Sequence, residues 1–135
     1  MSQSSVEIIH RFVRAYNRRD RDAVAALFHP DITWHPVGGP LFGVDTMHGR
    51  DETLEFLFEG IPGGIANFRA SVEDVSSLPD AQVLAAAHYT GRGVASGAEV
   101  EMDVTQIWRF DAGKIVFFGD FPTREQALEA AGLSE

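Results

Sequence analysis

One carboxylate lies inside an otherwise apolar stretch near the end of the chain, at Asp120 in the run IVFFGDF. A buried carboxylate is costly unless it is paired, hydrated or useful, so the position calls for an explanation. Apolar neighbours such as Phe118 would raise the pKa of this carboxyl and let it exchange protons near neutral pH. The alternative is a structural carboxylate that accepts a hydrogen bond from a buried tyrosine or from the start of a following helix. The sequence leaves both interpretations open.

Gln106 is the second candidate for chemistry, because it lies on the apolar side of the preceding run. Its amide could donate to a developing oxyanion or only satisfy a polar neighbour. Tyr16 and Tyr89 could point hydroxyl groups at a ligand, or bury their rings and keep the hydroxyls at the rim. The remaining residues of the predicted ligand-binding wall are aromatic: Phe12, Trp34, Trp108 and Phe118.

Other classes of site find little support in the sequence. It contains no phosphate-binding loop, no dinucleotide fingerprint, no nucleophile elbow and no paired-histidine zinc motif. The absence of cysteine excludes disulfides and zinc-thiolate sites. No two histidines have the spacing of metal ligands on a helix, so each is interpreted as structural. We therefore expect neither a metal nor a cofactor.

Composition narrows the expected partners and location. The net charge of -9 repels phosphate backbones, so nucleic-acid binding is not expected. The first residues lack the apolar run of a signal peptide, and no segment has the length of a membrane span. We expect a cytoplasmic protein with no membrane contact. A chain of 135 residues fits one domain, spanning 1–135.

A predicted hairpin over residues 98–122 carries both candidate residues. Apolar and polar residues alternate along its first strand, with Gln106 on the apolar side. Asp103 falls on the polar side and is expected to be solvated or at an interface. Residues 111–113 have the composition of a short turn, with glycine at positive φ. Both faces of the second strand, which holds Asp120, are expected to be buried.

The segments before the hairpin contain three predicted helices and further strands. Helical spacing of apolar residues predicts helices over 5–18 and 50–61, the latter ended by Pro62 and two glycines. Asp20 is expected to cap a short second helix. A strand at 31–35 leads into a long loop at 37–47, and whether that loop closes over a pocket stays open.

The second half of the chain predicts a sheet closed by one more helix. Four long strands between residues 66 and 121 form an antiparallel meander, and Thr123 with Gln126 makes a capping box for the last helix. Helices segregated to one side of a curved antiparallel sheet give an α+β fold. Such a sheet can fold around its helices as a cone that encloses an apolar pocket, a common place for a small-molecule site.

Three motifs together resemble one known family. They are AYNRRDRDAVAALFHPDITWH for the first helices and strand, MHGRDETLEFL for the third helix, and IWRFDAGKIVFFGDF for the hairpin. The chain resembles the SnoaL-like branch of the NTF2-like superfamily, which includes polyketide cyclases, ketosteroid isomerases and limonene-epoxide hydrolases. This resemblance covers nearly the whole chain. It implies a cone-shaped α+β fold with a curved sheet wrapped around helices, an internal pocket and a homodimer built on the sheet.

The functional residues of these related enzymes are matched in this chain to different extents. The resemblance places Phe12 where isomerases have a donor tyrosine, Pro36 at the isomerase base and Gln106 at their second donor, so the isomerase set is largely missing. The resemblance places Ala87 and Tyr89 where epoxide hydrolases have an arginine and an aspartate, so that only their other aspartate is kept, as Asp120. A carboxylate equivalent to Asp120 is the acid/base of SnoaL-type cyclases, whose accompanying histidine is replaced here by Gln106.

These observations imply a protein that binds a small, largely apolar molecule. If it is an enzyme, the expected chemistry is a cofactor-independent isomerisation, cyclisation or hydrolysis, with Asp120 as acid/base and Gln106 as donor. The alternative is a module of the same fold that binds a small molecule or dimerises without catalysis. Dimerisation is further expected from Ile107, which faces outward from the sheet and would leave an apolar face exposed in a monomer.

Overall fold

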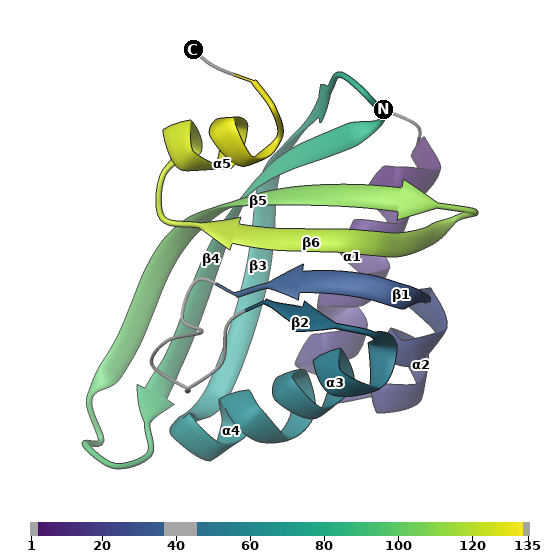
Figure 1. The fold of residues 1–135 in the computed structure, drawn as a ribbon. Coiled ribbons are helices and arrows are strands. Elements are labelled where there is room, and N and C mark those ends of the chain that lie inside the picture. The colour runs from purple at the N-terminus through teal and green to yellow at the C-terminus, as the bar shows by residue number, and fades with distance from the viewer. Residues whose placement is uncertain (1–2, 37–45, 134–135) are drawn as a thin grey trace.

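The computed structural model describes residues 3–36 and 46–133 as helices on a strongly curved sheet (Figure 1). The elements follow in the order α1 (Gln3–Asn17), α2 (Arg21–Leu27), β1 (Phe28–His35), β2 (Met47–His48), α3 (Arg50–Glu55), the π-helical turn η2 (Phe56–Gly60), α4 (Ile61–Gly64), β3 (Ile65–Leu78), β4 (Gln82–Gly93), β5 (Glu99–Asp111), β6 (Lys114–Phe121) and α5 (Arg124–Ala130). The expected α+β class is confirmed. The loop expected at 37–47 falls mostly on residues 37–45, outside the described residues.

The sheet has the strand order β2-β1-β6-β5-β4-β3 and is open. The predicted antiparallel meander from β3 to β6 is confirmed. β1 also joins this sheet, parallel to β6, with Trp34 opposite Phe118. That long-range pairing was not predicted from the sequence, and it brings the first strand to the wall of the pocket described below.

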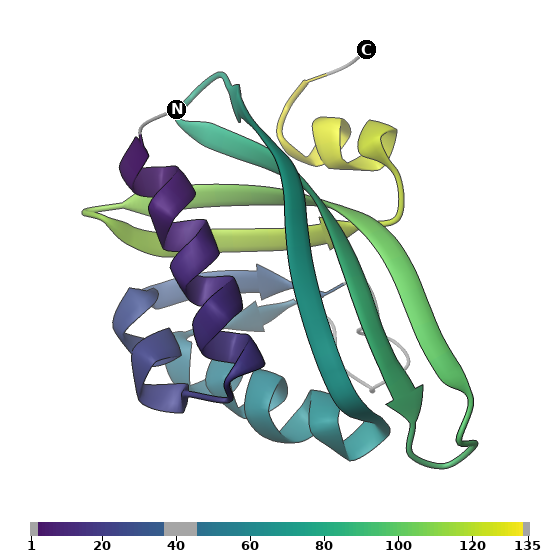
Figure 2. The same ribbon diagram turned by 180° about the vertical axis from the view of Figure 1, so that it is seen from behind.

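Two apolar clusters lie on opposite faces of the sheet. Trp108 belongs to the larger cluster, together with the buried side of α1, which crosses the sheet in Figure 2. Ile107, its neighbour in β5, points to the other face and packs with α5 residues such as Leu128. The expectation that Ile107 leaves an exposed apolar face is wrong, because α5 covers it and its exposed fraction is 0%.

The third helix runs further than the sequence predicts. It was expected to end at Ile61, but helical structure continues to Gly64 through the π-helical turn η2. The wider turn lets Pro62 occupy the first positions of α4, where a missing backbone N–H costs least. The proline therefore starts a helical turn here and does not end the helix.

Local signals elsewhere are confirmed. The side chain of Asp20 accepts from the backbone N of Ala23 at 3.1 Å and caps α2. Thr123 accepts from the backbone N of Gln126 at 3.1 Å and caps α5. Among the described residues, no helix is long and apolar enough to cross a membrane.

The cover provided by α5 can be tested through Leu128, which is buried against Leu84 and Ile107. We expect Leu128→Ala to lower the free energy of unfolding by about 2 kcal/mol or more, because it removes apolar contact and leaves a cavity. Glu129→Ala, at the next and exposed position, is the matched control and should change stability by less than about 0.5 kcal/mol. Urea unfolding measures both, and equal effects would contradict the packing of α5.

Candidate active site

A cavity of about 400 Å³ lies between the helices and the inner face of the sheet. Its wall is mostly apolar and rich in aromatic rings, which come from α1, β1, η2, β3 and β6 as Phe12, Tyr16, Trp34, Phe56, Phe68 and Phe118. Polar side chains enter it from β4, β5 and β6 as Tyr89, Gln106 and Asp120. The structure thus brings the candidate carboxylate and amide to one apolar cavity.

Seven of the eight predicted site residues line this cavity. Trp108 does not, because it lies behind the wall with an exposed fraction of 0%. Phe56 and Phe68 also form part of the wall and were not predicted from the sequence. Phe68 could have been found from the alternation of Phe68, Ala70 and Val72 along β3, because residues two apart in a strand share a face.

Strand register explains why the polar residues meet. Gln106 in β5 lies directly opposite Asp120 in β6 and Ala85 in β4. Tyr89 is four residues beyond Ala85 in β4, on the same face of the strand. Its side chain points into the same cavity, and its hydroxyl oxygen lies within hydrogen-bond distance of both the Gln106 amide and the Asp120 carboxylate.

These residues and Trp108 form a continuous chain of hydrogen bonds. The indole N–H of Trp108 donates to Oε1 of Gln106 at 3.0 Å. Nε2 of Gln106 donates to the hydroxyl oxygen of Tyr89 at 2.9 Å. The Tyr89 hydroxyl in turn reaches both Asp120 oxygens, at 2.7 Å and 2.8 Å. Asp120 ends the chain and is the group in it that can carry a negative charge at neutral pH.

The buried position changes the acidity of Asp120. Burial raises the pKa of its carboxyl from 3.8 to about 7, although hydrogen bonding by Tyr89 and Gln106 acts in the opposite direction. Burial and the neighbouring carboxylate also raise the pKa of Tyr89 well above its ordinary value, so this phenol stays protonated. Asp120 thus accepts from a buried tyrosine, which was the structural alternative from the sequence. Its raised pKa meets the condition that the chemical interpretation requires, and that interpretation stays a prediction.

Tyr16 contributes its ring to the cavity and its hydroxyl to the scaffold. The hydroxyl donates to the backbone oxygen of Leu57 at 3.0 Å, and burial raises the pKa of Tyr16 to about 12. In a π-helical turn this oxygen would accept from the residue five positions later, which is Pro62 and has no N–H. Tyr16 supplies the missing donor, so its hydroxyl is not free for a ligand.

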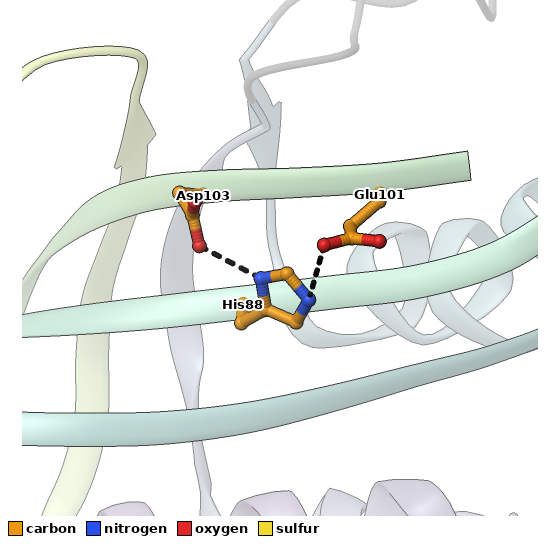
Figure 3. A network of polar contacts seen from close by, with 3 residues as sticks. All are labelled: His88, Glu101 and Asp103. Atoms are coloured by element: carbon orange, nitrogen blue, oxygen red, sulfur yellow. Dashed lines mark hydrogen bonds and ion pairs between the residues drawn. The ribbon is translucent and has the colours of Figure 1, made fainter.

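A second polar cluster joins His88 of β4 to Glu101 and Asp103 of β5 (Figure 3). His88 is the neighbour of Tyr89 in β4, so its side chain lies on the face of the sheet opposite to the cavity. Nδ1 of His88 lies 2.7 Å from Asp103 and Nε2 lies 3.5 Å from Glu101. The hydrogen bond to Asp103 raises the pKa of His88 above 6.5. Asp103 is exposed, as its polar side of the strand predicted. Within the described part of the chain, no group of three His, Cys, Asp or Glu residues could hold a metal ion.

Comparison with known proteins agrees with this architecture. A model of the SnoaL-like domain matches residues 9–118. Among solved structures, an NTF2-like protein of unknown function from Burkholderia pseudomallei has a TM-score of 0.79 and 24% identity, covering 96% of this chain and 97% of that chain. No curated protein sequence matches the chain.

Two further structures belong to proteins described as enzymes. SalBIII, an epoxide hydrolase/cyclase-like enzyme in pyran ring formation in the polyether salinomycin, has a TM-score of 0.74 and 21% identity, covering 90% of this chain and 92% of that chain. An LEH-like epoxide hydrolase from M. tuberculosis has a TM-score of 0.72 and 18% identity, covering 95% and 89% of the two chains. At these identities the likeness shows the fold alone.

The raised pKa of Asp120 gives a pH dependence with a defined sign. The folded protein holds the proton more tightly than the unfolded chain, so stability falls as pH rises from about 4 to about 7. A change from 3.8 to about 7 corresponds to about 4 kcal/mol. We expect Asp120→Asn to remove this part of the pH dependence, as measured by urea unfolding at about pH 5 and pH 8.

The exposed Asp31→Asn is the control, because it should keep the wild-type slope. Carbon-13 NMR of the carboxyl groups gives the pKa of Asp120 directly, and Tyr89→Phe should raise it further by removing a donor that favours the charged form. An Asp120 pKa near 3.8, or equal slopes in the wild type and Asp120→Asn, would contradict this account.

Proposed function

Because the chain belongs to the SnoaL-like domain family, we propose that its cavity binds a small, largely apolar molecule and that Asp120 exchanges a proton with it. The observation that carries the proposal is Asp120, the one carboxyl group among the described residues that line this largely apolar cavity, with a pKa raised to about 7. An acid of this kind has both protonation states available at neutral pH, which suits general acid/base catalysis.

The size and lining of the cavity define the proposed ligand class. Its volume of about 400 Å³ lies in the lower part of the range for small-molecule sites, about 300–1,000 Å³. The tyrosine hydroxyls and the Gln106 oxygen are already paired within the protein. A ligand with an apolar body and one polar group directed at Asp120 therefore fits best.

The proposed reaction is an isomerisation, cyclisation or hydrolysis without metal or cofactor. As the carboxylate, Asp120 would take a proton from an activated C–H, an O–H or a water molecule. As the acid, it would return the proton to a carbonyl, ether or epoxide oxygen of the ligand. Tyr89 would stabilise the carboxylate in each cycle by its hydrogen bond. Proteins of the same fold described as epoxide hydrolase or cyclase-like support this class of chemistry.

A second candidate function is ligand binding without turnover. Two observations favour it. The polar groups of Tyr16, Tyr89 and Gln106 already hydrogen-bond to one another or to the backbone. Among the described lining residues, the only titratable groups besides Asp120 are these two hydrogen-bonded tyrosines. In this case the cavity holds its ligand and Asp120 acts as a hydrogen-bonding partner alone.

Proton exchange with small cyclic ketones separates the two functions. We expect the protein to bind such ketones, seen as a rise in melting temperature, and to incorporate deuterium from heavy water next to the carbonyl. Asp120→Asn should keep the binding and slow the exchange by at least about 100-fold. Ala70→Leu, which narrows the cavity, should weaken binding itself.

Binding without any Asp120-dependent exchange would support the non-catalytic function and contradict the enzyme. The absence of binding by ketones, lactones and epoxides of matching size would contradict both functions. Asp31→Asn, at an exposed position in β1, should behave as the wild type in each assay.

We also propose that the protein forms a homodimer, which the family resemblance implies. Beside the start of α5, the outer face of the sheet carries a shallow groove with small residues such as Ala86 and Thr105, where a second copy could approach closely. The dimer should appear in sedimentation equilibrium at micromolar concentration. A monomer at that concentration would refute this part of the proposal.

A further inference from the structure

Trp108 lies at the end of the hydrogen-bond chain furthest from Asp120 and does not line the cavity. We propose that Trp108 is a positioning residue that fixes the direction of the hydrogen bonds running through Gln106 and Tyr89 to Asp120. The inference rests on the proposed function for its catalytic meaning, but the direction of the hydrogen bonds can be tested in the ligand-free protein.

The direction follows from what each group can donate. An indole N–H donates and never accepts, so the Gln106 atom beside it must be the amide oxygen. The amide NH₂ then faces Tyr89 and donates to the phenol oxygen at 2.9 Å. With that oxygen engaged as an acceptor, the phenol hydrogen is directed to Asp120. One donor at Trp108 thus decides the orientation of two further groups.

The indole itself cannot change direction, because packing holds it from several sides. Its exposed fraction is 0%. The ring makes edge contacts with Phe118 at a centroid distance of 4.7 Å and with Phe12 at 5.7 Å. Since Trp108 and Gln106 are two residues apart in β5, their side chains also share one face of the strand. The donor is therefore fixed by both the strand and the aromatic cluster.

Without the indole N–H, the Gln106 amide would lose the donor that holds its oxygen away from Tyr89, and the reversed orientation would become accessible. In the reversed one its oxygen accepts from Tyr89, and the phenol no longer donates to Asp120. The carboxylate would then lose its charge-stabilising hydrogen bond, and its proton affinity would rise. Trp108 therefore helps to keep Asp120 in the range where both protonation states are present at neutral pH.

The test measures the Asp120 pKa by carboxyl carbon-13 NMR in the ligand-free wild type, Trp108→Phe, Gln106→Leu and the double variant. We expect Trp108→Phe to increase the proton affinity of Asp120 about fivefold, the effect of losing one hydrogen bond. In the Gln106→Leu background the same change should have no further effect, because the amide that transmits it is absent.

A second measurement keeps the test valid if Trp108→Phe unfolds the protein. Benzothienylalanine at position 108 preserves the ring size and replaces the N–H by sulfur, so it removes the donor with little change in packing. It should raise the Asp120 pKa as Trp108→Phe does, with the fold checked by circular dichroism.

Two results would overturn the inference. One is an unchanged Asp120 pKa in both Trp108 replacements, which would make Trp108 a packing residue only. The other is an equal effect of Trp108→Phe with and without Gln106, which would mean that it acts through packing or burial and not through the amide. Neither result depends on ligand binding, so failure of this inference is distinct from failure of the proposed function.

Discussion

Burial of the Asp120 carboxyl is the constraint on which the site depends. A carboxyl group in an aromatic cavity loses its hydration, and only specific donors can compensate for that loss. The compensation comes from β4, through the hydroxyl of Tyr89, and from β5, through the Gln106 amide. The hydrogen bonds to Asp120 therefore depend on the register of β4, β5 and β6. A slip by one residue would turn its donors to the other face of the sheet.

The wall of the cavity is fixed by contacts that its residues make with neighbouring helices. α1 supplies Phe12 and Tyr16, and Tyr16 anchors this helix to the π-helical turn through Leu57. On the far face, α5 covers Ile107, the neighbour of both Gln106 and Trp108 in β5. One face of β5 thus packs against α5, and its other face holds Gln106 and Trp108 of the hydrogen-bond chain. The contacts that stabilise the fold therefore also position the site.

Features encoded by neighbouring residues could be predicted from the sequence. Alternation along β5 placed Gln106 and Asp103 on opposite faces, and short capping signals placed Asp20 and Thr123. An isolated acid in an apolar run identified Asp120 as the centre of the site. The resemblance to the family, carried by local motifs, supplied the arrangement of sheet and helices that these separate signals could not.

Features that depend on distant pairs could not be predicted. Nothing near Trp34 indicates that β1 lies parallel to β6, and nothing near Ile107 indicates that α5 covers it. Trp108 was assigned to the pocket wall, because a sequence does not show which buried aromatic ring faces a cavity and which lies behind it. Its contact with Gln106 required the side-chain orientations as well as the strand parity.

Pro62 influences the polarity of the cavity although it is not one of the residues that line it. Because it lacks an N–H, the Leu57 oxygen is left to Tyr16, whose hydroxyl is thereby withdrawn from the interior. A homologue with any other residue at this position could give that oxygen a backbone partner and return a phenol to the ligand. Replacement of this proline alone can thus change the polarity of the cavity between relatives, while every residue of the cavity wall stays the same.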